Sequence, residues 1–334
     1  MEGCLNSTLP VAYFGGKSKV AKQVWAALGD VQNFIEPFFG SGAVLLGRPR
    51  GHKGKTETVN DIDQFLANFY RSVIHDADAV AEYADYPINE AELLSRHLWL
   101  VSVGKQRMQD GMVADPDWYD AKIAGWWLWG LNQWLGSGWC HGKGPWEIVD
   151  GKLKNVEKGG RSGKGVSKQL PQLSNGGVGQ NSGKLRGSKF YNLMEALAWR
   201  MRFVRVACGD WTRVVTDGVT DYGKTVGVFL DPPYTDTNDR SMDLYANDSP
   251  DIAHEVREWA IANGDRKNMR IVLAGYEGEH DMPDNWRKIA WVGNSSFSSP
   301  KGGGHNEVNR HRERLWFSPH CLVQKPTLFD LDGE

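Results

Sequence analysis

The sequence predicts an α/β protein with a largely parallel sheet, interrupted by an inserted module. Residues 33–76 follow the order strand, glycine turn, helix, strand, helix, which is typical of a parallel-sheet unit. Residues 203–210, 226–231 and 269–277 are strand-like and continue the same theme. We therefore expect a twisted α/β sheet with helices on both faces.

The first unit, residues 33–76, contains two strands, each followed by a helix. "NFIEPFF" (33–39) is a short apolar strand that enters the glycine turn of "GSGAVLL", and "TETVND" is a second strand that ends at Asp61. The next segment has Phe65, Phe69 and Val73 at helical spacing. A strand–helix–strand order of this length requires parallel pairing of the two strands.

The later elements have clear boundaries. A helix is expected after residue 249, with Ser249 as N-cap, Pro250 at its first position and Gly264 at its end. "RERLWFSP" (312–319) is expected to be the last strand. These elements complete the sheet that the first unit begins.

The middle of the chain differs from both flanks. Its pattern is helical, then irregular and rich in glycine, then helical again. We expect a discontinuous α/β domain of residues 1–76 and 190–334, and a separate module of residues 77–189.

Bulk composition limits the class of protein. The chain has 334 residues, 40% of them hydrophobic, which suffices for one large domain or two ordinary ones. No apolar run has the length of a membrane span, and the N-terminus lacks a secretory signal pattern. Four scattered cysteines without a CxxC pair suit reduced thiols, so we expect a cytoplasmic protein.

Positive charge is concentrated in one segment, residues 152–189. Residues 152–189 carry nine Lys and Arg and only one acid, Glu157, although the net charge of the whole chain is −2. A basic segment rich in Gly, Ser and Asn favours phosphate binding, although a solvated loop without a partner would have the same composition. Nearby, Trp126, Trp127, Trp129 and Trp134 are expected in a helix core.

Two further tryptophans in this region, Trp139 and Trp146, lie among glycines, where we expect exposed platforms for base stacking. The residues expected to contact DNA are Trp139, Lys143, Trp146, Lys152, Lys154, Lys158, Arg161, Lys164, Lys168, Lys184, Arg186 and Lys189.

The segment "DPPY" follows the strand 226–230 directly. Two consecutive prolines end the strand and hold Asp231 and Pro232 extended, without an N–H donor on either proline. The carboxylate, the carbonyls and the Tyr234 ring suit a planar group with two N–H donors, such as adenine N6, cytosine N4 or a side-chain amide. An ordinary turn capped by Asp231 is the alternative interpretation.

Other polar and glycine residues lie at neighbouring strand ends. Gly40 and Gly42 allow close approach of a ligand before a helix N-terminus, Asp61 ends the next strand, and "ACGDW" places Asp210 and Trp211 after a third. Near the N-terminus, "YFGGK" is a glycine turn between aromatic residues and Lys17.

The ordered set "YFGGK", "IEPFFGSG", "NDID", "CGDW" and "DPPY" resembles the Dam-type DNA adenine-N6 methyltransferases. The resemblance covers the first 76 residues and roughly 190 to 319, and it implies a Rossmann-like methyltransferase sheet interrupted by a DNA-recognition module. It also implies S-adenosylmethionine as cofactor, S-adenosylhomocysteine as product, no metal, and double-stranded DNA as partner. A monomer is expected, with a dimer as the alternative, in a bacterial or phage-infected cell.

The resemblance assigns roles to particular positions. The Glu36–Gly42 loop would surround the methionine part of the cofactor, Asp61 would bind the ribose, and Asp210 with Trp211 would bind the adenine. The full set implied to bind the cofactor is Tyr13, Phe14, Gly15, Gly16, Lys17, Glu36, Pro37, Phe38, Gly40, Gly42, Asp61, Asp210 and Trp211. The implied catalytic residues are Asp231, Pro232, Pro233 and Tyr234.

The residues alone leave two other functions open. A cytosine-N4 or other amino-methyltransferase could use the same tetrad, although glutamine-directed enzymes typically carry Asn at the place of Asp231. A DNA-binding relative that has lost activity would keep the fold, but the intact tetrad argues against it.

Overall fold

The computed structural model describes residue 17 and residues 20–49, 51–87, 89–134, 139–140, 146–149, 152–155, 189–233, 252–291 and 312–323. In these ranges the strands are β1 (Asn33–Glu36), β2 (Thr56–Asp61), β3 (Trp146–Val149), β4 (Lys152–Asn155), β5 (Arg205–Cys208), β6 (Val226–Leu230), β7 (Met269–Tyr276), β8 (Arg287–Ala290) and β9 (Glu313–Phe317). The helices are α1 (Ala21–Leu28), α2 (Ala43–Leu46), α3 (Gln64–Ala84), α4 (Glu90–Trp99), η1 (Leu100–Gly104), α5 (Lys105–Ala114), α6 (Ala121–Leu131), α7 (Lys189–Met201), η2 (Trp211–Val214), α8 (Asp217–Thr220) and α9 (Ile252–Asn263).

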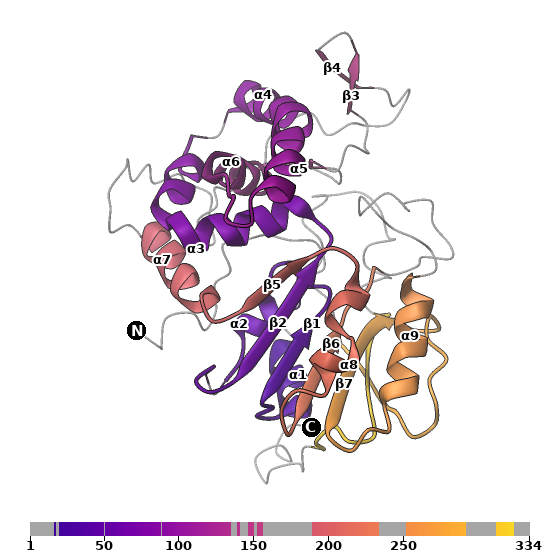
Figure 1. Ribbon diagram of the computed structural model, residues 1–334. Coiled ribbons are helices and arrows are strands. Elements are labelled where there is room, and N and C mark those ends of the chain that lie inside the picture. Colours follow the sequence, from indigo (N-terminus) through magenta and orange to yellow (C-terminus); the bar gives the residue numbers. More distant parts are fainter. Residues whose placement is uncertain are drawn as a thin grey trace, which may run out of the picture.

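A seven-stranded sheet forms the centre of the protein (Figure 1). Its strand order is β5-β2-β1-β6-β7-β9-β8, in which β5, β2, β1, β6 and β7 are parallel and β9 is antiparallel to both of its neighbours. The chain adds strands on one side of β1 and then on the other, so the strand order reverses between β1 and β6. In open α/β sheets, ligands bind at the carboxyl ends of the strands beside such a reversal.

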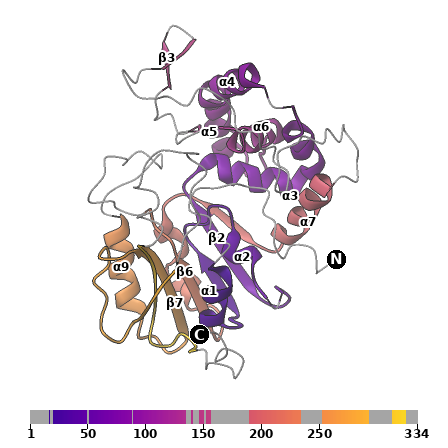
Figure 2. The same ribbon diagram turned by 180° about the vertical axis from the view of Figure 1, so that it is seen from behind.

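The sheet is covered on both faces, as the sequence predicts. Phe34 and Phe229 point toward α1 and α3, and they belong to one buried cluster. Their neighbours Ile35 and Leu230 point to the other face, where they pack with η2 and α9. This alternation follows from the period of two along a strand, and both faces are apolar because helices cover both (Figures 1 and 2).

The helices α3 to α7 gather beyond one end of the sheet, and the β3–β4 hairpin lies on the far side of this group (Figures 1 and 2). Helix α3 connects the two regions, because it starts directly after β2 and its helical backbone is broken at Asp76 (φ −152°, ψ 72°). The Asp76 carboxylate accepts a hydrogen bond from Ala79 N at 3.0 Å and so caps the second half of the helix. The domain boundary at residue 77 stays a prediction.

The expectation that Trp139 is an exposed platform is wrong. Its side chain is 2% exposed, and its Nε1 donates a hydrogen bond to the Trp127 carbonyl at 3.0 Å. Gly130 of α6 explains the burial, because a Cβ at that position would lie 1.9 Å from the Trp139 ring. The glycine leaves the space that the indole fills, beside His97 and Trp134. Trp127 and Trp129 are buried in the same core, as expected.

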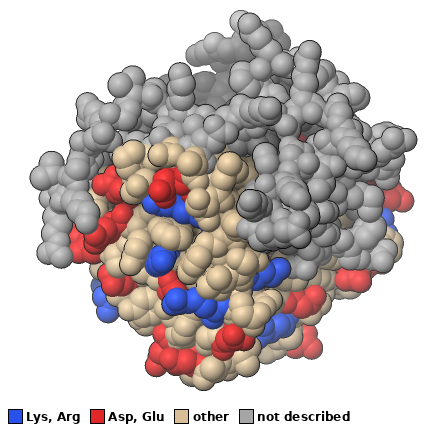
Figure 3. All heavy atoms as spheres, turned by 90° about the horizontal axis from the view of Figure 1, so that it is seen from above, with Lys and Arg blue, Asp and Glu red and all other residues tan. Residues whose placement is uncertain are grey.

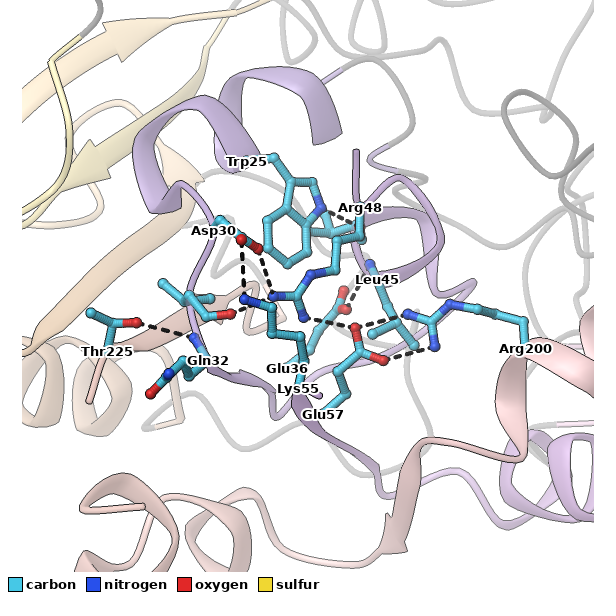
Figure 4. A network of polar contacts seen from close by, with 12 residues as sticks. Trp25, Asp30, Gln32, Glu36, Leu45, Arg48, Lys55, Glu57, Arg200 and Thr225 are labelled. Carbon is cyan, nitrogen blue, oxygen red and sulfur yellow. Dashed lines mark hydrogen bonds and ion pairs between the residues drawn. The ribbon is translucent and has the colours of Figure 1, made fainter. Parts of the chain in front are cut away.

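A buried ionic network connects α7 to the sheet (Figure 4). Glu57 of β2 is 1% exposed and lies between two arginines. Arg48 Nη1 donates to Glu57 Oε1 at 2.9 Å, and Arg200 of α7 contacts both carboxylate oxygens at 2.8 and 2.7 Å. Arg48 also covers the Trp25 ring and lies 3.6 Å from Asp30. The network thus fixes the return of the chain from the helical region to β5.

Candidate active site

Four acidic side chains lie at the carboxyl ends of four adjacent strands. Glu36 ends β1, Asp61 ends β2, Asp210 follows β5 by two residues, and Asp231 follows β6 directly. Because β5, β2, β1 and β6 are neighbours and parallel, these residues share one edge of the sheet. The structure therefore brings together the strand-end residues that the sequence analysis singled out.

The glycine loop after β1 is held by backbone and side-chain hydrogen bonds. Gly40 and Gly42 have positive φ values of 48° and 72°, which a side chain with a Cβ disfavours. Gly40 N donates to Asp61 Oδ2 at 2.9 Å, so the loop is tied to the end of the neighbouring strand. Leu45 N donates to Glu36 Oε2 at 3.2 Å, which satisfies one of the free N–H groups of α2.

Asn60 is a site residue that the sequence analysis missed. Its Nδ2 donates to the Pro37 carbonyl at 3.1 Å and to the Gly209 carbonyl at 2.9 Å. It therefore ties the loops after β1 and β5 to β2. A buried Asn near the end of a strand is a sequence signal for such a residue, because its side-chain amide needs hydrogen-bond partners that the neighbouring loops supply.

Burial raises the pKa values of two carboxyl groups at this edge of the sheet, those of Glu36 and Asp61. Desolvation raises the pKa of Glu36 well above its ordinary value, and the nearby Asp231, Glu57 and Asp61 carboxyls raise it further. Desolvation, followed by the charge of Asp63, raises the pKa of Asp61 to about 6. Hydrogen bonds from the backbone N–H groups of Asp63 and Gly40 act in the opposite direction. A ligand with hydroxyl donors or a positive charge would favour the ionised forms.

The loop after β5 combines an acid with stacked aromatic rings. Asp210 Oδ1 accepts a hydrogen bond from Thr212 N at 2.9 Å and so caps the N-terminus of η2. Trp211 is buried, and Phe38 of the glycine loop stacks against it with ring centroids 6.1 Å apart. Trp259 of α9 meets Trp211 edge to face, so the indole is held from two sides.

Lys17 and Asp231 form an ion pair at this edge. Lys17 Nζ lies 3.0 Å from Asp231 Oδ1, and both side chains are largely buried. Both residues are expected in the site from the sequence, but their contact could not be predicted, because they are far apart in the chain. Pro232 is buried and Pro233 half-buried, which is consistent with a stiff corner after β6.

Several predicted residues lie outside the described residues. These are Tyr13, Phe14, Gly15, Gly16, Lys143, Lys158, Arg161, Lys164, Lys168, Lys184, Arg186 and Tyr234. Trp146 lies on β3, Lys152 and Lys154 on β4, and Lys189 begins α7. Their role in DNA binding stays a prediction. Figure 3 shows basic and acidic side chains interspersed on the described part of the face seen from above.

Replacing Gly42 with Ala is expected to destabilise the fold. The new Cβ would lie 2.7 Å from the Phe39 ring and 3.1 Å from Tyr70 Oη, in addition to the backbone strain at φ 72°. Gly54→Ala is the matched control, because Gly54 has φ 71° and nothing lies within 4 Å of an added Cβ. Urea unfolding should show a larger loss of stability for Gly42→Ala than for Gly54→Ala, and equal losses would contradict the close packing of the glycine loop.

The geometry of the strand ends agrees with a comparison to known families. Residues 13–98 match the D12 class N6 adenine-specific DNA methyltransferase family. This match confirms the resemblance seen in the sequence, and the sheet is consistent with a Rossmann-like methyltransferase fold. The matched part includes Lys17, the glycine loop and Asp61, and it ends before Asp231. No curated protein matches the chain significantly.

Two further observations concern the described residues alone. None of their helices combines the length and apolar character that crossing a bilayer requires. His, Cys, Asp and Glu side chains in the same part of the chain do not form a group of three or more that could hold a metal ion.

Proposed function

We propose that the protein transfers a methyl group from S-adenosylmethionine to N6 of an adenine in double-stranded DNA. The observation that carries this proposal is the row of strand-end residues beside the reversal of strand order, which ends at the Asp231–Pro232–Pro233 corner after β6. The family match of residues 13–98 supports adenine as the target base.

The cofactor would lie along the ends of β1, β2 and β5. The glycine loop approaches the methionine part closely because Gly40 and Gly42 have no side chain. Asp61 would accept hydrogen bonds from the ribose hydroxyls, and Asp210 with the Phe38–Trp211 stack would face the adenine ring. Held in this way, the cofactor would supply its methyl group at the end of β6.

Asp231 would act on the target amine. Adenine N6 is unreachable inside the duplex, so the base must leave the stack at a cost of a few kcal/mol. The Asp231 carboxylate and the Pro232 carbonyl would accept hydrogen bonds from its two N–H groups, while Tyr234 stacks on the ring. These acceptors concentrate electron density on the nitrogen and stabilise the positive charge that develops as it attacks the methyl carbon. Formation of the nitrogen–carbon bond would break the bond between that carbon and sulfur and release S-adenosylhomocysteine, and the amine would then lose its proton to water. Binding both reactants side by side would supply much of the acceleration.

Nucleoside analysis tests the proposal. The protein is incubated with S-adenosylmethionine that carries a labelled methyl group and with unmodified double-stranded DNA, and the DNA is then digested to nucleosides. The expected product is labelled N6-methyldeoxyadenosine. Label in N4-methyldeoxycytidine would show the same chemistry on another base and would contradict adenine as the target. The absence of label transfer would contradict methyl transfer to DNA.

The basic segment gives a prediction for DNA binding. Deleting residues 152–189 should weaken DNA affinity and flatten its dependence on salt, because each lost phosphate contact makes the negative slope of log K against log salt less steep by about 0.9. A second variant with Gln at the six Lys and Arg positions from 158 to 186 keeps β4 and the start of α7. Fluorescence anisotropy at several salt concentrations measures the slope, and an unchanged slope would show that the segment is only a linker.

A further inference from the structure

Glu313, at the start of β9, lies beside the Lys17–Asp231 ion pair. Its Oε2 is 4.0 Å from Lys17 Nζ, whereas Asp231 Oδ1 is 3.0 Å from the same nitrogen. Glu313 Oε2 is buried and has no hydrogen-bond partner among the described residues. The Lys17 ammonium also lies 5.5 Å from the centre of the buried Trp291 ring. One ammonium group is therefore within reach of two carboxylates, and it is closer to one of them.

The proposed function requires a change in this arrangement. Asp231 must accept a hydrogen bond from the target amine and stabilise a developing positive charge. A lysine ammonium on the same carboxylate competes for its oxygen atoms and opposes that charge. Moving the ammonium into bulk water would leave Glu313 as a buried charge without a counterion, which is costly. If the Lys17 ammonium moves to the nearby Glu313 carboxylate instead, both charges stay paired inside the protein.

We propose that Glu313 is a positioning residue that receives the Lys17 ammonium when the target amine binds to Asp231. This inference rests on the proposed function. In the resting protein Lys17 neutralises Asp231, and in the complex with substrate it pairs with Glu313. The exchange requires only a small movement of the Lys17 ammonium, because its nitrogen already lies 3.0 Å from Asp231 Oδ1 and 4.0 Å from Glu313 Oε2. No covalent bond forms or breaks.

The surroundings of Glu313 explain how this exchange depends on pH. Desolvation raises the pKa of Glu313 to about 7, the negative charge of Asp231 raises it as well, and the positive charge of Lys17 lowers it. On the adjacent β7 its strand partner is Tyr276, whose ring is covered by Arg312, and Trp291 N donates to the Glu313 carbonyl at 3.2 Å. Arg314 is paired with Glu277 instead.

The ionisation of Glu313 determines in which direction pH changes the activity. Below the pKa of Glu313 the carboxyl group is neutral and cannot hold the ammonium, so Lys17 stays on Asp231 and competes with the target amine. As the pH rises through about 7, Glu313 ionises and the exchange becomes favourable. We therefore expect kcat/KM to rise with pH through this region, with an apparent pKa that belongs to the cluster of three groups.

The variant Glu313→Gln tests the proposal. It keeps the shape of the side chain but removes the charge, so kcat/KM at pH 8 is expected to fall about tenfold, within the range of coupling between residues of one ionic network. The rise of kcat/KM near pH 7 should disappear. Glu277→Gln is the matched control, because Glu277 also follows a strand of this sheet and pairs with Arg314 and Lys288 at the surface.

A second measurement does not depend on turnover. The ¹⁵N signal of the Lys17 ammonium group, assigned with Lys17→Met, is followed during addition of S-adenosylhomocysteine and target DNA at pH 8. The signal should shift in the wild type and not in Glu313→Gln. If the wild type methylates DNA but the two proteins share the same pH profile and the same shift, the role of Glu313 is overturned. If the wild type transfers no methyl group, the proposed function itself fails.

Discussion

Asp231→Ala is expected to lower the rate of methyl transfer about 100- to 1,000-fold, the usual cost of removing one hydrogen-bonding group that acts in the transition state. The carboxylate has no substitute among the described residues at the end of β6, since the next two residues are prolines without an N–H group. Single-turnover transfer of labelled methyl groups to DNA measures the effect, and calorimetric titration with S-adenosylhomocysteine should give an affinity close to that of the wild type.

The matched control for this variant is Asp217→Asn. Asp217 is an exposed acid in the first turn of α8, away from the four strand ends. It should keep wild-type activity. Full activity of Asp231→Ala would remove the acceptor role on which the proposed mechanism depends, and a parallel loss of cofactor binding would indicate that Asp231 shapes the cofactor site instead.

Glu57→Gln is expected to destabilise the fold by about 3 to 5 kcal/mol, the usual effect of removing one partner from a buried ion pair. The amide keeps the size of the side chain but removes the buried negative charge with which both Arg200 and Arg48 pair (Figure 4). Urea denaturation followed by circular dichroism measures the free energy of unfolding.

Glu258→Gln is the control for the stability experiment. Glu258 pairs with Arg257 on the surface of α9, where solvent screens the charges, so its replacement should change the unfolding midpoint little. If Glu57→Gln were as mild as this control, α7 would not depend on the ionic network for its attachment to the sheet.

The elements of the sheet could be predicted from the sequence because particular residue types mark where each strand ends. The strand 226–230 is entirely apolar and stops at Asp231 and two prolines, and β2 stops at the polar pair Asn60–Asp61. Parallel pairing follows from the strand–helix–strand order. The sequence places acids at the ends of these strands, and they share one edge of the sheet because the strands are parallel neighbours.

Contacts between distant segments could not be predicted in the same way. The Lys17–Asp231 pair joins the first residues of the fold to the end of β6, and Glu313 reaches it only because β9 pairs antiparallel with β7. No local pattern specifies that register. Trp139 was misjudged for a related reason, since its glycine-rich neighbourhood suggested exposure while the space left by Gly130 in α6 determined its burial.

The central claim is that S-adenosylmethionine binds across the ends of β5, β2 and β1 with its reactive carbon beside Asp231. A crystal structure of the protein with S-adenosylhomocysteine tests it most directly. We expect the ribose on Asp61, the adenine next to Phe38 and Asp210, and the sulfur atom facing the end of β6. A cofactor bound elsewhere, or a sulfur atom directed away from Asp231, would contradict the claim.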